Sequence, residues 1–200
     1  MSFRNVLAPY VLIDGIDLSG KSSVIKRILE RDRNWTRQHS SLCQHNPILH
    51  EAKSLEKDGS LWIGLVYVSA LEYDIRNFSY PTQPTVQDST ILLRSLAYHK
   101  AAGYSRVLKK LESFIPSHPT FDRSYILTAR PEVKRLRLDE RIRTGQQVLS
   151  VNDLKIVSDP QFFSEMEAAI IDYGVNIFGA KVIDGSDLTF DEIVAEMDLF

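Results

Sequence analysis

The sequence predicts an α/β protein in which a parallel sheet is covered by helices on both faces. Short apolar segments alternate along the whole chain with longer segments whose apolar residues recur every three or four positions. The first short segment runs into a glycine turn, and 44% of the 200 residues are hydrophobic, which is enough for one continuous core. Strands separated by helices need crossover connections, and these make neighbouring strands parallel.

The first half of the chain is predicted to hold three strands and two long helices. Residues 10–13 are apolar, partly β-branched and followed by an Asp-Gly pair, which is the pattern of a buried strand that enters a turn. The other predicted elements are a helix over residues 21–32, a strand over 35–39, a loop with a short helix over 40–59, a long helix over 61–78 that Pro81 and Pro84 end, and a strand over 85–88.

The second half is predicted to continue the alternation, with cap residues at the start of two helices. Asp159 precedes a proline at the first helical position, and Thr189 forms a capping-box pattern with Glu192. The predicted elements are helices over 90–102 and 104–115, a strand over 124–128, a helix from Pro131, a helix with an apolar stripe from Phe162 to Ile177, a strand over 181–184 and a final helix from Thr189.

Charge and composition exclude several classes of function. Lys and Arg total 24 against 26 Asp and Glu, a balance that argues against a protein that coats nucleic acid. One cysteine, Cys43, cannot form an intramolecular disulfide, and the five histidines show no zinc-finger spacing. The longest apolar stretch, residues 62–71, is too short to span a bilayer, and the N-terminus lacks a secretory pattern. We therefore expect a single cytoplasmic domain, residues 1–200, with no nucleic-acid or membrane partner.

The strongest motif is a phosphate-binding loop between the first strand and the first helix. Residues 15–22 match G-x-x-x-x-G-K-[ST] at every fixed position. The glycines let backbone N–H groups surround a polyphosphate, Lys21 can reach its β- and γ-phosphates, and the Ser22 hydroxyl can bind Mg²⁺. The motif predicts ATP and Mg²⁺ as cofactors. The predicted nucleotide-binding residues are Gly15, Asp17, Ser19, Gly20, Lys21, Ser22 and Ser23.

Residues 11–23 resemble the opening of thymidylate kinases and related nucleoside and nucleotide kinases. That family shows a strand, an acid-Gly pair and an Asp inside the loop. Further similar segments follow in family order: Asp88 before Ser-Leu-Ala-Tyr-His at 95–99, Arg-Pro-Glu-Val at 130–133, Asp153 with 159–163, Tyr173, 182–185 and 192–194. The resemblance implies a three-layer α/β/α P-loop kinase fold with about five parallel strands and an Arg-rich lid over roughly residues 134–152.

The same comparison shows departures from the family pattern, and all of them concern the acceptor. The family's Asp-Arg pair is Asp88-Ser89 here, so an arginine expected on the acceptor's phosphate is missing from its usual place. No clean Arg-Glu-Pro segment follows the second strand. The Gln that helps to recognise thymine is His99, and the spacing from Asp88 to Ala97 is one residue longer. The donor half of the site therefore matches the family, and the acceptor half departs from it.

Five basic residues occur within residues 134–143, where the resemblance places the lid. In most proteins such a segment is a solvated helix face with i,i+4 ion pairs. Here the loop has no basic residue between Gly15 and Gly20, and phosphoryl transfer requires positive charge on the transferring group. We therefore expect Arg137 and Arg141, one turn apart, to be catalytic together with Lys21 and Asp88, without choosing between the two arginines.

The remaining predicted site residues concern the metal and the acceptor. Asp88 is expected at the carboxyl end of a strand, where it either holds Mg²⁺ with Ser22 or contacts the acceptor; the alternative is a helix cap. By resemblance Asp17 contacts a sugar hydroxyl of the acceptor, and Arg76 its phosphate or base. The alternatives are a helix-end charge for Arg76 and core positions for the tyrosines. The predicted acceptor-binding residues are Asp17, Glu72, Tyr73, Arg76, Tyr98 and His99; Glu72 stands where the family has a stacking aromatic.

The resemblance implies transfer of the γ-phosphoryl group of ATP to a nucleoside monophosphate, thymidylate in that family. The arginine missing after Asp88 favours a second hypothesis, in which the acceptor is a deoxynucleoside or another small hydroxylated metabolite. A nucleotide-binding protein without catalysis is the third hypothesis, and the intact Lys21-Ser22 pair counts against it. The expected partner is thus a nucleotide or another small-molecule acceptor, and a homodimer is left open.

Overall fold

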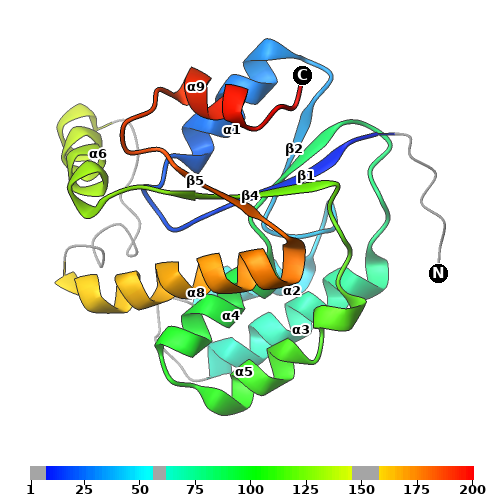
Figure 1. Ribbon diagram of the computed structural model, residues 1–200. Coiled ribbons are helices and arrows are strands. Elements are labelled where there is room, and N and C mark those ends of the chain that lie inside the picture. Colours follow the sequence, from blue (N-terminus) through cyan, green and yellow to red (C-terminus); the bar gives the residue numbers. More distant parts are fainter. Residues whose placement is uncertain (1–7, 56–61, 146–157) are drawn as a thin grey trace.

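The computed structural model describes residues 8–55, 62–145 and 158–200, and these form a parallel sheet between helical layers (Figure 1). Five strands occur in the order β2-β3-β1-β4-β5, and every neighbouring pair is parallel. The predicted fold class is confirmed. The strands are β1 (Tyr10–Asp14), β2 (Thr36–His39), β3 (Thr85–Asp88), β4 (Arg123–Thr128) and β5 (Lys181–Asp184).

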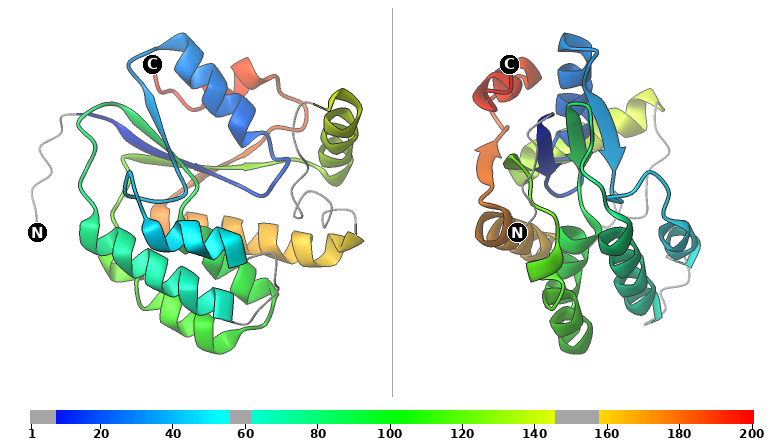
Figure 2. Two further views of the ribbon diagram at one scale, coloured as in Figure 1. Left: turned by 180° about the vertical axis from the view of Figure 1, so that it is seen from behind. Right: turned by 90° about the vertical axis from the view of Figure 1, so that its right-hand side faces the viewer.

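Helices cover both faces of the sheet, as Figures 1 and 2 show. One face carries α1 (Lys21–Arg31) and α9 (Phe190–Glu196). The other carries α4 (Ile91–Ala101) and α8 (Pro160–Phe178), with α2 (Pro47–Leu55), α3 (Trp62–Asn77) and α5 (Ser105–Glu112) packed farther out. Helix α6 (Pro131–Thr144) lies beyond the carboxyl ends of the strands, at the left of Figure 1. None of the helices in the described ranges is long and apolar enough to span a membrane.

The central strand explains why both faces need a cover. Every residue of β1 is buried, and alternate side chains point to opposite faces. Val11 and Ile13 pack against apolar residues of α1 and α9, whereas Leu12 packs against residues of α4 and α8. A strand that is apolar on both faces is stable only between two helical layers.

The predicted elements agree with the observed ones to within a few residues at their ends. The capping box predicted at Thr189 is present, with the Glu192 carboxylate accepting from the Thr189 backbone N–H at 2.8 Å. Helix α8 has its predicted cap at Asp159. The part of the expected lid over residues 146–152, and Asp153, lie outside the described residues.

The amino ends of the strands meet a cluster of rings, hereafter the aromatic cluster: Tyr10, Phe78, Tyr80, His118, Phe121 and Phe178. The ring centroids of Tyr10 and Phe121 are 4.8 Å apart, and His118 lies 5.2 Å from Phe178. His118 donates from Nδ1 to the Pro119 carbonyl at 2.8 Å, and burial lowers the pKa of His118 to about 4. The aromatic cluster therefore closes the end of the sheet opposite the phosphate loop.

Candidate active site

The phosphate loop joins β1 to α1 through backbone conformations that require glycine. Gly15 and Gly20 have φ angles of +145° and +105°. A Cβ atom on Gly15 would lie 2.1 Å from the Leu127 carbonyl oxygen of β4, so no other residue fits at this position. The loop is thus held against the neighbouring strand at its first residue and enters the helix at Gly20.

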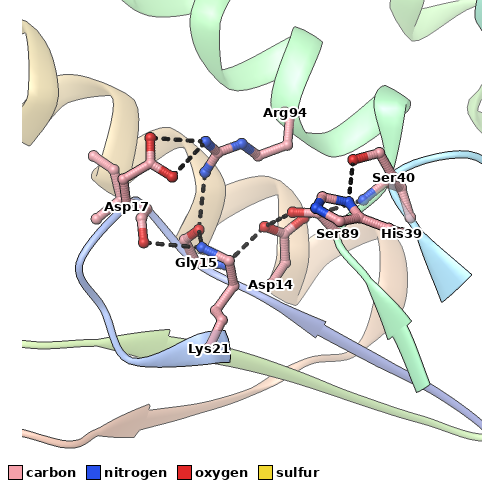
Figure 3. A network of polar contacts seen from close by, with 10 residues as sticks. Asp14, Gly15, Asp17, Lys21, His39, Ser40, Ser89 and Arg94 are labelled. Atoms are coloured by element: carbon pink, nitrogen blue, oxygen red, sulfur yellow. Dashed lines mark hydrogen bonds and ion pairs between the residues drawn. The ribbon is translucent and has the colours of Figure 1, made fainter. Parts of the chain in front are cut away.

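Lys21, the first residue of α1, turns its side chain back over this loop (Figure 3). Its Nζ donates to the carbonyl oxygens of Gly15 at 2.5 Å and Ile16 at 3.0 Å. Burial, and then the charge of Arg94, lowers the pKa of Lys21, against the opposite effect of nearby carboxylates. The lysine is therefore a partly desolvated cation at the mouth of the loop.

Asp14, the last residue of β1, is a fully buried carboxyl group behind the loop. It accepts from the backbone N–H of Gly15 at 2.7 Å and from Ser89 Oγ at 2.5 Å. Burial raises the pKa of Asp14, although Arg94 and Lys21 act in the opposite direction. Asp14 therefore connects the start of the loop to the segment after β3 through hydrogen bonds, which is a structural role.

Arg94 on α4 is a site residue that the sequence did not predict. Its guanidinium donates to the Gly15 carbonyl at 2.9 Å and to the Asp17 carboxylate at 3.3 and 3.4 Å, as Figure 3 shows. Burial acts to raise the pKa of Asp17, but the charges of Arg94 and Lys21 outweigh it and hold that pKa below its usual value. No local pattern in the sequence singles it out, because 79 residues separate Arg94 from Gly15.

A second arginine, Arg37 on β2, was also missed. It forms an ion pair with Asp88 at the end of the adjacent strand β3, and the Asp88 carboxyl group is almost fully buried. Asp88 thus lies at the carboxyl edge of the sheet, where it was expected, but with a cation beside it. No local pattern announces this pair, because 51 residues separate its members.

The basic segment of α6 divides into residues with different surroundings. Arg137 donates to the Leu18 carbonyl of the loop at 2.8 Å and to the Gly185 carbonyl at 3.2 Å. Lys134 is buried and donates to Glu167 of α8 at 2.5 Å. Arg141 lines the cavity at the loop, whereas Arg135 and Arg143 are exposed. The segment is therefore no uniform solvated face, and Arg137 and Arg141 hold distinct positions.

A cavity of about 250 Å³ lies between the phosphate loop, the ends of β2 and β3, α4 and α6. Of the predicted nucleotide-binding residues, Asp17, Gly20, Lys21, Ser22 and Ser23 line it together with Asp88 and Arg141, whereas Gly15 and the buried Ser19 do not. Among the described residues that line it, four cations face two carboxylates: Lys21, Arg37, Arg94 and Arg141 against Asp17 and Asp88. An excess of positive charge in a hollow at a helix N-terminus suits a polyanionic ligand.

Ser22 and Asp88 line this same cavity, so the hydroxyl and the carboxylate expected to serve Mg²⁺ share one space. An oxygen donor pair of this kind suits the ion, which favours few protein ligands and the oxygens of a phosphate substrate. No group of three or more His, Cys, Asp or Glu side chains suited to a metal occurs in the ranges that the structure describes. The residues therefore fit an ion that arrives with a nucleotide.

The other predicted acceptor residues lie outside this cavity. Glu72 and Arg76 form an exposed i,i+4 ion pair on α3 at 2.5 Å, and the Tyr98 ring packs against Phe162. His99 is buried and donates from Nδ1 to the Ser95 carbonyl at 2.7 Å; a Cβ on Gly64 would lie 2.7 Å from its Nε2. His99 therefore fills the contact between α3 and α4. Tyr73, on α3, borders neither this cavity nor the larger one described next.

A larger cavity of about 950 Å³ follows the outer edge of β2 toward the segment 79–83. It shares Arg37 and His39 with the smaller cavity, so the two meet at the carboxyl end of β2. Its other walls include Gln38, Cys43 and Asn46. Burial and Asp74 raise the pKa of Cys43 to about 11, so this thiol is not an activated nucleophile.

Comparison with known proteins supports the fold. The chain matches no family model and no curated protein sequence. It is similar to solved structures of thymidylate kinase from Candida albicans (TM-score 0.68, 13% identity, 94% of this chain and 88% of that chain) and deoxyadenosine kinase from M. mycoides (TM-score 0.62, 14% identity, 94% and 96%). Thymidylate kinase from Ehrlichia chaffeensis is similar at a TM-score of 0.58 and 13% identity, over 94% and 96% of the two chains. The chain thus has the fold of these P-loop kinases.

Proposed function

We propose that this chain is a P-loop kinase that transfers the γ-phosphoryl group of ATP to a nucleoside monophosphate. The observation that carries the proposal is the phosphate loop itself, with glycines at positive φ, Lys21 over its mouth and Arg141 in the lining of the same cavity. This arrangement gathers cations where a triphosphate would place its terminal groups.

The residues of the loop have separable tasks in such a reaction. A bound triphosphate would replace the Gly15 and Ile16 carbonyls as partner of Lys21, so that the lysine neutralises charge that develops on the transferring group. Arg137 holds the loop by a hydrogen bond to its backbone, and Arg141, which lines the same cavity, supplies further positive charge. Mg²⁺, brought by ATP and held by Ser22 and Asp88, would neutralise further phosphate charge.

Two candidates for the acceptor have support: a nucleoside monophosphate and a deoxynucleoside. Thymidylate kinases are among the similar structures, which supports a nucleoside monophosphate. The M. mycoides deoxyadenosine kinase structure holds dCMP and dCDP as products, and dCMP as a product supports the second candidate, a deoxynucleoside acceptor. Ser89 in place of an arginine also favours that second candidate. The excess of cations in the cavity favours the monophosphate.

The test is an ADP-release screen with Mg·ATP against deoxynucleosides, their 5′-monophosphates and small alcohols. Turnover with monophosphates supports the first candidate, and turnover restricted to unphosphorylated acceptors supports the second. Lys21→Ala is the control for a contaminating kinase, because it removes the lysine at the loop mouth. A folded protein that binds ATP but phosphorylates no acceptor would refute the kinase proposal and favour a nucleotide-binding role.

A further inference from the structure

Ser89, the residue after Asp88, brings no cation to the acceptor, and its structural role explains why. Ser89 has a φ angle of +67°, a conformation that costs a non-glycine residue free energy, and it is buried. Its Oγ donates to the buried Asp14 carboxylate at 2.5 Å. The side chain at this position therefore serves the interior behind the loop.

Arg94 brings a guanidinium to the cavity from a different place in the sequence. Thr90 caps α4, and Arg94 follows in its first turns, five residues after Ser89. Figure 3 shows the Arg94 side chain reaching from α4 across to Gly15 and Asp17. About a quarter of that side chain is exposed, and it lines the cavity with Lys21 and Asp88.

The present partners of Arg94 leave it suited to bind an anion. Its contacts with the Asp17 carboxylate, at 3.3 and 3.4 Å, are longer than the 2.7–2.9 Å typical of a charge-assisted hydrogen bond. Arg37, by contrast, is engaged by the buried Asp88, and Lys21 lies at the loop mouth. A planar guanidinium with several donors matches the oxygens of a phosphate.

We propose that Arg94 binds the phosphate of the acceptor and so selects 5′-monophosphates over nucleosides. In this arrangement the acceptor phosphate takes the place of the Asp17 carboxylate on the guanidinium. Arg94 thus supplies from α4 the cation that position 89 does not. The inference rests on the proposed function for the reaction, but it concerns binding of the acceptor and is testable without turnover.

The experiment measures the affinity of wild type, Arg94→Met and Arg94→Lys for four deoxynucleosides and their 5′-monophosphates by calorimetry, and for ATP in separate titrations. Arg94→Met is expected to weaken monophosphate binding by about ten- to a hundredfold, because one charge-assisted pair is lost, and to weaken nucleoside and ATP binding far less, so that the ratio of monophosphate to nucleoside affinity falls. Arg94→Lys keeps the charge and is expected to recover part of the loss. Lys100→Met, an exposed position on the same helix paired with Asp172, is the matched control.

The competing role for Arg94 is support of the phosphate loop through the Gly15 carbonyl. In that case ATP binding falls in both variants while the ratio of monophosphate to nucleoside affinity stays that of wild type, and the proposal is overturned. Wild type that binds nucleosides as tightly as monophosphates also overturns it. If Arg94→Met does not fold, Arg94→Lys alone decides by the same ratio. Monophosphate binding that depends on Arg94 without any turnover would support this inference and count against the proposed reaction.

Discussion

The two ends of the sheet differ in composition: charged side chains occupy the carboxyl ends of the strands, and aromatic rings occupy the amino ends. At the carboxyl ends of β1 and β3, Asp14 and Asp88 are buried carboxyl groups among cations, and Leu18, Ser40 and Ser89 have positive φ angles. At the amino ends the aromatic cluster fills the space with rings, and the buried His118 has an unpartnered Nε2 among the described residues.

This difference separates function from stability within one molecule. Strained backbone and desolvated charges cost folding free energy, and they persist where the surrounding structure compensates for them. Packed rings contribute apolar burial that needs no ligand. Substitutions at the carboxyl end are therefore expected to change turnover more than unfolding, and substitutions at the amino end to do the reverse.

The largest expected effect is that of Lys21→Ala at the carboxyl end. Turnover is expected to fall by roughly two to four orders of magnitude, since one group that stabilises developing charge is removed. The melting temperature is expected to stay level or rise, because burial already disfavours this ammonium. Steady-state ADP release and calorimetric melting are the two measurements.

Lys26→Ala is the matched control for Lys21→Ala, because Lys26 lies on the same helix with a side chain 77% exposed. It is expected to keep both turnover and melting temperature. Near-normal activity in a folded Lys21→Ala protein would contradict the assignment of the loop lysine.

Two arginines of α6, Arg137 and Arg141, are expected to affect different steps at the carboxyl end of the sheet. Arg141→Ala is expected to lower kcat by about a hundredfold, since Arg141 lines the cavity and its charge acts on Asp17 of the loop. Arg137→Ala is expected to weaken ATP binding, because Arg137 joins Leu18 of the loop to Gly185. Exposed Arg143→Ala is the control. Equal, negligible effects of all three substitutions would contradict a catalytic role for Arg137 and Arg141.

At the amino end, His118 is expected to make stability depend on pH. Its folded pKa of about 4 lies below the usual histidine value of 6.5, so between these values the unfolded chain binds a proton that the folded chain excludes. The contribution of His118 to the free energy of unfolding is therefore fully present well above pH 6.5. The free energy of unfolding is expected to fall by about 3 kcal/mol as the pH drops to 4.

Urea unfolding of wild type and His118→Phe between pH 7 and pH 4 measures this contribution. His118→Phe is expected to lack that part of the decline and to keep its turnover at pH 7, because the aromatic cluster is remote from the loop. The exposed His50→Gln is the control and is expected to retain the wild-type slope. If the free energy of unfolding depends on pH equally in His118→Phe and wild type, His118 does not contribute to stability in this way, and the proposed difference between the two ends is contradicted.

The sequence predicted nearly all of the fold, because its signals are local. Alternating short and long apolar segments, the cap at Asp159 and the capping box at Thr189 each depend on neighbours a few residues away. The phosphate loop is local for the same reason: its glycines, Lys21 and Ser22 occupy eight consecutive residues.

The rest of the site could not be predicted, because it is made by contacts between distant segments. Arg94 meets Gly15 across 79 residues, and Arg37 meets Asp88 across 51. Lys134 belongs to a basic segment in the sequence, but in the fold it is buried against Glu167. Nothing in a window of neighbouring residues distinguishes such a cation from an exposed one.

The smallest expected effect concerns the choice of base. None of Glu72, Tyr73, Arg76, Tyr98 and His99 borders the cavity at the loop, and His99 is committed to the contact with Ser95 and Gly64. A base therefore lacks the stacking platform and the amide that the family resemblance implies for thymine. We expect kcat/KM for thymidylate to exceed that for the best alternative monophosphate by no more than about tenfold, which corresponds to one hydrogen-bonding penalty. Competition assays with pairs of deoxynucleoside monophosphates measure this ratio. A preference of about a thousandfold would require several such contacts, and it would show that α3 turns Tyr73 and Arg76 toward the base when the acceptor binds.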